Sequence, residues 1–455
     1  MNDELLKLVQ NLPADYVEVR VQESNGTSVH YSGEDLEDIG EKTSRGGCVR
    51  ALVDGGWGFA TFNDLDDLER YARRAVEQAR LVQGEAFELA PVETVQDSYS
   101  NAGDLSTDPR GVPLQDKQQL CQRYNEILLA AQDVQTSRVS YRDSTAHVWY
   151  ANSEGTSIEQ EYVFCGCSTM AIAVDGPNIQ RAYESIGSLE GFERIVDMDE
   201  DVEAVVERVR KVLAAKPVEA GTYDVIVDPK LCGVFVHEAF GHLSESDFLY
   251  ENPRLREIMQ LGKRFGDEIL TIVDDGSIER ENGFLAYDQE GVPTGRTELI
   301  REGVLTGRLH NREAAAKMGE KPTGNARAIS YRHPPIVRMT NTFMEPGESS
   351  FEEMLQDTPD GIYAIGSVGG QTNMEMFTFT PEEAWRIRDG KLDERVREVV
   401  LSGNVFQTLA SIDMIGQDLE MYGGMGGCGK GGQSPLRVGD GGPHCRIKNV
   451  NIGGR

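Results

Sequence analysis

The sequence lacks the long hydrophobic runs and the cysteine framework that mark several classes of protein. No apolar stretch approaches the roughly 18 residues that a membrane-spanning helix needs. Mean hydropathy is −0.42. Seven cysteines are scattered along 455 residues without regular spacing. A large chain of this kind is expected to keep its thiols reduced, so they remain available to a metal.

The chain is also poor in basic residues. It carries 45 Lys and Arg against 76 Asp and Glu, a formal charge of −31. A field of this sign repels phosphate backbones, so we expect no nucleic-acid partner. The first seven residues, Met1 to Lys7, place acids where a secretory signal carries bases, and no apolar segment follows them. We therefore expect a cytoplasmic protein with no membrane partner.

The length allows two or three domains, and the patterns divide the chain near residue 217. Residues 16–62 are predicted to form strands and turns, because 16–21, 48–53 and 57–62 show the period-two alternation of strands between glycine turns. Apolar residues at helical spacing predict helices over 64–82, 113–132 and 199–215. We predict an α+β fold, with a mixed amino-terminal domain over 1–217 and a strand-rich, metal-binding catalytic domain over 218–455.

The second half is richer in short strands and glycine. A strand at 223–228 precedes Pro229, which suits the first turn of a helix. A hairpin is expected around Glu302-Gly303. Further strands are expected at 361–365, 378–380, 396–401 and 447–452. The glycine-dense stretch 423–442 lies inside this domain, so a flexible linker does not explain it.

The segment His237-Glu238-Ala-Phe-Gly241-His242 contains the residue types of a catalytic metal site. Imidazole nitrogen is a favoured zinc ligand, and a neighbouring glutamate can take a proton from water. In the familiar zinc-peptidase motif the histidines stand four apart, but here they stand five apart. In a regular helix, side chains five residues apart point in directions that differ by about 140°, which would separate the two rings. A π-type turn, or the end of the helix, would bring them together, and Gly241 would lower the cost of that distortion.

A catalytic zinc needs a third protein ligand, which must come from elsewhere. Glu245 is either a ligand or an acid that orients His242. Cys428 has glycine neighbours, which let its backbone approach a site closely, and Lys430 would favour its thiolate. On chemistry alone Cys428 leads by a small margin. The full set of candidates is Cys232, Glu245, Cys428, His444 and Cys445.

Several separated motifs resemble the TldD/PmbA (TldE) peptidase family, once described as modulators of DNA gyrase. The resemblance is strongest from about residue 220 to the glycine-rich stretch. The matching segments are His237-Glu-Ala-Phe-Gly-His242, Thr323-Gly-Asn-Ala-Arg327, Arg338-Met-Thr-Asn-Thr342, Leu401-Ser-Gly-Asn404 and Gly427-Cys-Gly-Lys-Gly-Gly-Gln-Ser434.

The resemblance implies a zinc peptidase with His237, His242 and Cys428 as metal ligands and Glu238 as general base. It also implies a dimer, formed with a second copy or with a sister subunit that lacks the His-Glu motif. Because this chain retains the motif, it resembles the catalytic subunit. The expected substrates are short peptides and unfolded polypeptides.

Two alternatives remain. One is a modulator of DNA gyrase, and the charge of −31 argues only against its direct contact with DNA. The other is an adaptor subunit that binds a partner and uses zinc only structurally. A structural zinc would have four protein ligands and no open position. No residue is assigned to substrate binding. Four polar residues in the matching segments would either hold substrate or pair strands and turns: Asn325, Arg327, Arg338 and Asn341.

Overall fold

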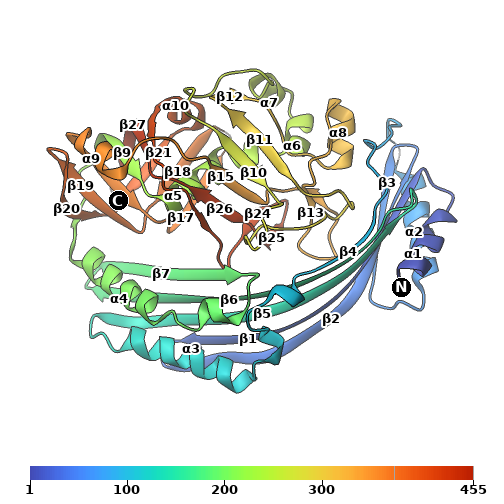
Figure 1. The fold of residues 1–455 in the computed structure, drawn as a ribbon, viewed down its shortest axis with the longest axis horizontal. Coiled ribbons are helices and arrows are strands. Elements are labelled where there is room, and N and C mark those ends of the chain that lie inside the picture. The colour runs from blue at the N-terminus through green and yellow to red at the C-terminus, as the bar shows by residue number, and fades with distance from the viewer. Residues whose placement is uncertain (83, 374, 454–455) are drawn as a thin grey trace.

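The chain folds into a mixed helix-and-strand structure in which a curved, largely antiparallel sheet lies against a strand-rich domain (Figure 1). The computed structural model describes residues 1–82, 84–373 and 375–453. The expected α+β class is confirmed. No helix among these residues is long and apolar enough to cross a membrane.

The first sheet has seven strands in the order β3-β2-β1-β5-β6-β4, with β7 beside β6. Several strands are far longer than the usual five or six residues. Strand β5, for example, continues without a break over 19 residues. The strands are β1 (Tyr16–Ser32), β2 (Asp35–Val53), β3 (Gly56–Phe62), β4 (Gln96–Ser100), β5 (Val134–Asn152), β6 (Ser157–Asp175) and β7 (Asn178–Ser188).

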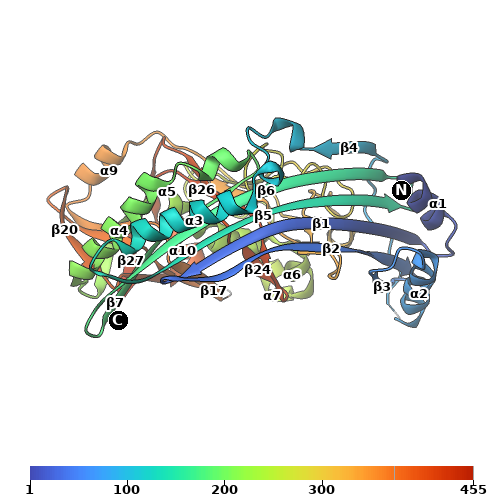
Figure 2. The same ribbon diagram turned by 90° about the horizontal axis from the view of Figure 1, so that it is seen from below.

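Four helices cover the outer face of this sheet (Figure 2). Alternate residues of β1, such as Val17 and Val19, are fully buried beneath them. The helices bury apolar stripes at the predicted spacing, as Val202, Val205 and Val209 do in α4. These helices are α1 (Asn2–Gln10), α2 (Leu68–Leu81), α3 (Leu114–Leu129) and α4 (Asp199–Ala214), and short 3-10 turns occur at Ala102–Asp104, Pro109–Gly111 and Phe192–Ile195.

The second half contains two larger sheets. A ten-stranded sheet runs β17-β18-β21-β27-β9-β16-β19-β20-β8, with β22 beside β27, and a six-stranded sheet runs β12-β11-β10-β15-β26-β23. The strands of the first are β8 (Lys216–Pro217), β9 (Gly221–Val227), β16 (Asp360–Ile365), β17 (Gly369–Asn373), β18 (Met376–Thr380), β19 (Glu383–Arg388), β20 (Lys391–Arg397), β21 (Val400–Asn404), β22 (Ile412–Ile415) and β27 (Cys445–Gly453).

The second of these sheets contains β10 (Ile272–Asp275), β11 (Arg296–Arg301), β12 (Val304–Leu305), β15 (Asn341–Met344), β23 (Glu420–Tyr422) and β26 (Gly439–Gly442). Two small ribbons pair β13 (Ala326–Arg327) with β14 (Ile336–Val337) and β24 (Cys428–Lys430) with β25 (Gln433–Leu436). The helices of this half are α5 (Pro229–Val236), α6 (Ser246–Glu251), α7 (Pro253–Ile258), α8 (Arg312–Met318), α9 (Phe351–Gln356) and α10 (Val405–Ala410).

One strand prediction in this half is wrong. Residues 396–401 were expected to form a single strand, but β20 ends at Arg397 and β21 begins at Val400. Glu398 between them has φ of 60°, in the left-handed region that ends a strand. The apolar residues on both sides pack into the same core, which explains why they read as one run. The predicted hairpin at Glu302-Gly303 is confirmed as β11 and β12.

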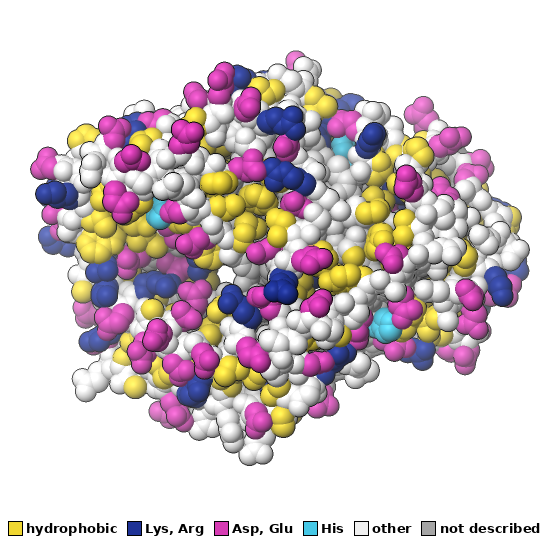
Figure 3. Space-filling view, in the orientation of Figure 1, with side chains coloured by type: hydrophobic (Ala, Val, Ile, Leu, Met, Phe, Trp, Pro, Cys, Tyr) yellow, Lys and Arg dark blue, Asp and Glu magenta, His cyan; other side chains and the backbone are white. Residues whose placement is uncertain are grey.

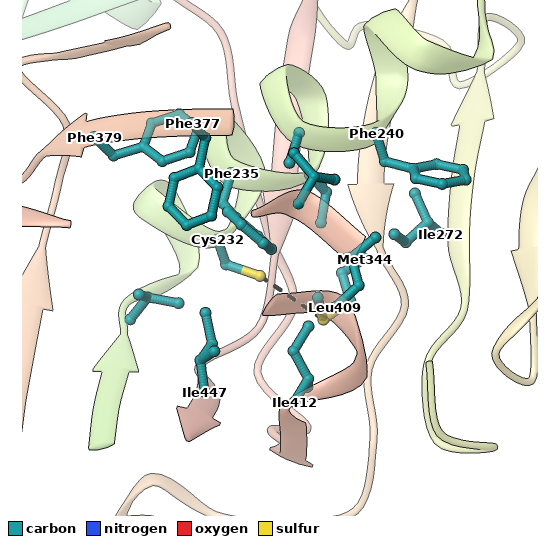
Figure 4. Packing of buried hydrophobic residues seen from close by; sticks show 14 of the residues in the cluster. Cys232, Phe235, Phe240, Ile272, Met344, Phe377, Phe379, Leu409, Ile412 and Ile447 are labelled. Atoms are coloured by element: carbon teal, nitrogen blue, oxygen red, sulfur yellow. Dashed lines mark hydrogen bonds between the residues drawn. The ribbon is translucent and has the colours of Figure 1, made fainter. Parts of the chain in front are cut away.

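Helix α5 packs between the two sheets of the carboxy-terminal half and forms the centre of its core. Figure 4 shows Cys232 and Phe235 of α5 pointing into a cluster with Phe377 and Phe379 of β18. The Phe235 ring lies edge-on to both, with centroids 5.5 and 5.9 Å away. This packing fixes the helix that leads to His237.

Polar contacts join the two halves. The Gly187 N–H of β7 donates to the Gly423 carbonyl at 2.9 Å, which anchors the glycine-rich stretch against the first sheet. Arg50 of β2 forms a buried ion pair with Glu290 of the carboxy-terminal half. The inner face of the first sheet therefore borders the region that holds the His-Glu motif.

We predict that Gly233→Ala destabilises the protein, because α5 approaches β26 too closely for a side chain. A Cβ at Gly233 would lie 2.5 Å from the Gly441 nitrogen. Overpacking of this kind typically costs about 1–3 kcal/mol. Thermal or urea unfolding should show a lower midpoint. The matched control is Gly40→Ala in β2, where a Cβ would meet nothing within 4 Å. Equal midpoints for the two variants would contradict the prediction.

Candidate metal centre

The motif helix begins with ordinary capping chemistry. The Asp228 carboxylate accepts from the Leu231 N–H at 2.9 Å, and Pro229 occupies the first turn. The hydrogen-bonding pattern of the helix then changes at His237. Residues His237–Gly241 form a π-type turn, and the His242 N–H donates to the His237 carbonyl. This i→i+5 bond places residues five apart on one face, which confirms the expected distortion.

Gly241 serves this turn for a different reason from the one expected. Its φ of −54° and ψ of −53° are ordinary helical values that any residue adopts. However, a Cβ there would lie 2.0 Å from the Met339 sulfur, and Met339 is fully buried. Glycine is needed because the turn packs closely against its neighbour.

The two imidazole rings lie at right angles with their centroids 5.3 Å apart. Each ring has a carboxylate beside its Nδ1 atom. Asp440 of β26 lies 2.6 Å from His237 Nδ1, and Glu245 lies 2.9 Å from His242 Nδ1. A carboxylate at Nδ1 favours a proton there and directs Nε2 toward the ligand point, where a metal would replace any proton on Nε2.

Cys428 reaches the same point from the glycine-rich stretch. Its Sγ lies 3.1 Å from His242 Nε2. One ligand atom from each of His237, His242 and Cys428 falls within 4.8 Å of the others. A Cβ at the preceding Gly427 would lie 2.3 Å from the Leu436 carbonyl oxygen, so glycine is required for the ribbon to fold back here.

The charges in this group favour metal binding. Burial alone raises the pKa of the Cys428 thiol, but hydrogen bonds from both histidines lower it to about 5. Burial lowers the pKa of His242, yet Cys428 and Glu245 outweigh this and raise it to about 9. The cysteine is thus a thiolate at neutral pH, and thiolate with two imidazoles is a donor set that zinc prefers. These residues fit a zinc ion.

Glu238 lies beside the ligand group and is half-buried. Burial raises the pKa of its carboxyl, while the two histidines lower it. No hydrogen bond holds this carboxylate within the described part of the chain. It is therefore available to a bound molecule.

Glu245 and Lys430 support the group from behind. Glu245 is completely buried and lies 3.2 Å from Lys430 Nζ. Lys430 also donates to Asp247 at 2.6 Å. Burial alone raises the pKa of Glu245, but Lys430 and then His242 lower it below its usual range. Because Glu245 contacts Nδ1 rather than the open side of the ring, it orients His242.

The other candidate ligands lie elsewhere. Cys232 and Cys445 are fully buried in the core, and Cys232 contacts the Met344 sulfur at 3.8 Å. His444 is held between the Tyr363 hydroxyl at 2.8 Å and Asp418 at 2.6 Å. None of them belongs to the described cluster of metal-capable groups.

The four polar residues left unassigned are all buried and bonded within the protein. Asn325 donates to Asp274 and to the Arg338 carbonyl. Arg327 donates to the Met339 and Arg437 carbonyls. Arg338 and Asn341 are fully buried, and each donates to a backbone carbonyl. These contacts tie the four residues into the wall beside the site.

Asp440 was not found from the sequence. It stands in Gly439-Asp440-Gly441-Gly442, a run without the periodicity that identifies an element. The available signal was chemical, since it is the one carboxylate in that run and metal-bound histidines need such a partner.

Two cavities flank Glu238. The larger, about 870 Å³, is lined by Glu238 and His242 together with Gly370 and Gln371 of β17. The smaller, about 250 Å³, is lined by His237, Glu238 and Cys428 together with Lys230 and residues of β7. Figure 3 shows an opening between the first sheet and the carboxy-terminal half, bordered by basic and acidic side chains. The site is thus reached from two sides.

Models of a PmbA/TldA metallopeptidase match three segments: domain 1 at residues 17–79, the central domain at 107–216 and the C-terminal domain at 220–454. A metalloprotease of Synechocystis sp. is 45% identical over 442 residues, covering 97% of this chain and 95% of its own. A zinc metalloprotease TldD homolog of Saccharolobus solfataricus is 28% identical, covering 99% of both chains.

The crystal structure of TldE from Thermococcus kodakarensis shares the fold, with a TM-score of 0.77 at 17% identity over 99% of each chain. The family models and the Synechocystis relative span both halves of the molecule and the residues of the metal-capable group. This chain therefore belongs to the TldD/PmbA family of metallopeptidases.

Proposed function

We propose that this protein is a zinc-dependent peptidase that hydrolyses peptide bonds in short or unfolded polypeptides. The observation that carries the proposal is the convergence of His237, His242 and Cys428 beside the unpaired carboxylate of Glu238. The zinc metalloprotease name of the Saccharolobus relative supports the choice of metal.

Each residue of the group has a distinct task. Asp440 and Glu245 hold the two Nδ1 atoms, so that both Nε2 atoms and the Cys428 thiolate face one point. When bound there, zinc would supply Lewis acidity that polarises a carbonyl and lowers the pKa of water. Glu238 takes the proton from the attacking water and passes it to the leaving amine.

The number of ligands favours catalysis over a structural metal. A structural zinc has four protein ligands, whereas a catalytic zinc has three and one open position. Three such residues form the group within the described chain. The cavities on both sides of Glu238 give a substrate access to that position.

Strand β17 offers a place for an extended substrate. Among the described residues it is the outermost strand of the ten-stranded sheet, and it pairs with β18 on its inner side. It also lies against the π-type turn, and its residues Gly370 and Gln371 line the larger cavity. An extended peptide can add to such an edge through backbone hydrogen bonds, with little demand on its side chains.

Association with a second subunit stays a prediction of the family resemblance. Light scattering on the isolated chain tests it, and a stable, fully active monomer would contradict it.

We predict that Cys428→Ser sharply lowers zinc affinity. Loss of an outer partner of a metal ligand typically costs about 10–100-fold in affinity, and loss of a ligand should cost more. Zinc content is measured on protein stripped with chelator and then reloaded. The controls are Cys232→Ala and Cys445→Ala, two buried thiols outside the group. Full zinc retention by Cys428→Ser would remove this residue from the ligand set.

We predict that Glu238→Gln keeps its zinc and loses about 10²–10⁴-fold in kcat, because an amide cannot accept the proton. The control is Glu251→Gln, a residue that lines the larger cavity away from the ligand group. Turnover near that of the wild type by zinc-loaded Glu238→Gln would assign the proton transfer to another group.

We predict that unfolded substrates are cleaved and compact folded ones are not. A strand edge binds a chain whose own backbone groups are unpaired, and a folded domain presents few of these. The measurement compares one sequence as a folded domain and as its destabilised, unfolded variant. Chelator should abolish cleavage and zinc should restore it. Similar rates for the folded and unfolded forms would show that the site is open to folded proteins.

A further inference from the structure

The smaller cavity contains a group that the proposed hydrolysis does not use. This space of about 250 Å³ lies between α5, β7 and the glycine-rich stretch. Glu238 and Asp440 lie in its lining at the metal-capable end. Lys230 is its one Lys or Arg among the described residues.

Lys230 shares a helix face with the metal-capable group. Lys230, Val234, His237 and Glu238 all line this cavity, and the spacing of four and three residues places Lys230, Val234 and His237 on one side of α5 and of the turn that continues it. Seven residues of helix rise by about 10 Å. The cavity is therefore acidic and metal-capable at one end and basic at the other.

The ammonium group of Lys230 has unused hydrogen-bonding capacity. It lies 3.3 Å from Glu382 and 3.5 Å from Glu184, and these are ion pairs too long for good charge-assisted hydrogen bonds. An ammonium has three donors, and within the described chain no hydrogen bond from Lys230 is formed. Only 19% of its side chain is exposed. A bound acceptor would use these donors.

Lys230 is charged, and the two acidic residues beside it also contact a second cation. Burial lowers the pKa of Lys230, but Glu382 and Glu184 outweigh that effect and raise it. Both carboxylates also pair with Arg208, which donates to Glu382. Lys230 and Arg208 thus share the two carboxylates.

We propose that Lys230 binds a carboxylate of the substrate about three residues to the carboxyl side of the cleaved bond. Extended chain advances about 3.3 Å per residue, so three residues span the roughly 10 Å between Lys230 and the metal-capable group. The proposal rests on the proposed peptidase function. It adds that the enzyme recognises a carboxylate on the carboxyl side of the cleaved bond.

The carboxylate has two possible sources, and both use the same chemistry. It is either the terminal carboxylate of a peptide that ends at this position or an acidic side chain of a longer peptide. In the first case the enzyme releases short carboxy-terminal fragments. Because the cavity is small and part of its wall is formed by Gly423, Gly424, Gly426 and Gly427, it takes a thin extended segment.

The test uses zinc-loaded protein and four peptides of one sequence. Two of these peptides end three residues beyond the cleaved bond, one with a free terminal carboxylate and one with a terminal amide. The other two peptides continue beyond that point, one with Glu and one with Gln as the third residue after the cleaved bond. A hydrogen bond to a charged group is worth about 10- to 100-fold in kcat/KM. We expect that preference for at least one carboxylate over its neutral match, and the favoured pair identifies the source.

Lys230→Met should abolish the preference, lowering cleavage of the carboxylate peptide to the rate of its neutral match without changing zinc content. The control is Lys263→Met, a lysine that lines a separate surface groove. Equal rates within both pairs for the wild type would overturn the proposal, as would a preference that survives in Lys230→Met. Cleavage of none of the four peptides by zinc-loaded wild type would instead contradict the peptidase function, and this proposal with it.

Discussion

The hydrogen bond from the His242 N–H to the His237 carbonyl is the constraint on which the candidate site depends. It widens one turn of the motif helix, so that two histidines five residues apart face the same point. A regular helix would direct them about 140° apart, and no third ligand would bring them together. The packing of Gly241 against Met339 and of Phe235 against β18 keeps this turn in place.

Compensated charge is the second requirement of the site. Buried Glu245 and Lys430 and half-buried Asp247 form a chain behind His242, and Asp440 stands behind His237. Removing one member of a buried ion pair leaves an uncompensated charge, which is strongly destabilising. The polar residues around this chain, such as Asn325 and Arg338, are bonded into the same wall. The same contacts therefore serve both the fold and the metal-capable group.

Sequence patterns predicted the helices well and the long strands only in part. Helices α2, α3 and α4 have apolar stripes of their own, so periodicity was sufficient. Residues 22–32 at the end of β1 and 35–47 at the start of β2 are mostly polar, contain glycine and gave no such signal. These residues form strands because each pairs with neighbours on the sheet, which is a tertiary effect.

The candidate site was also predicted only in part from the sequence. The His-Glu spacing is local, and it predicted the π-type turn. Residue chemistry gave Cys428 only a small lead among five candidates, because sequence spacing carries no information on which distant segment folds against α5. Geometry placed Cys428 beside the histidines and the other candidates elsewhere. Asp440 and Lys230 were missed because their importance depends on what faces them in space.

The contact between Cys428 and His242 joins residues 186 positions apart. Contacts of such long sequence separation form late in folding, because the entropy of closing the intervening loop must be overcome first. During synthesis the histidines leave the ribosome long before the cysteine does. An incomplete chain therefore carries the motif without the assembled centre. A peptidase built in this way gains its hydrolytic capacity only on completion, and its own nascent, unfolded segments are not exposed to it.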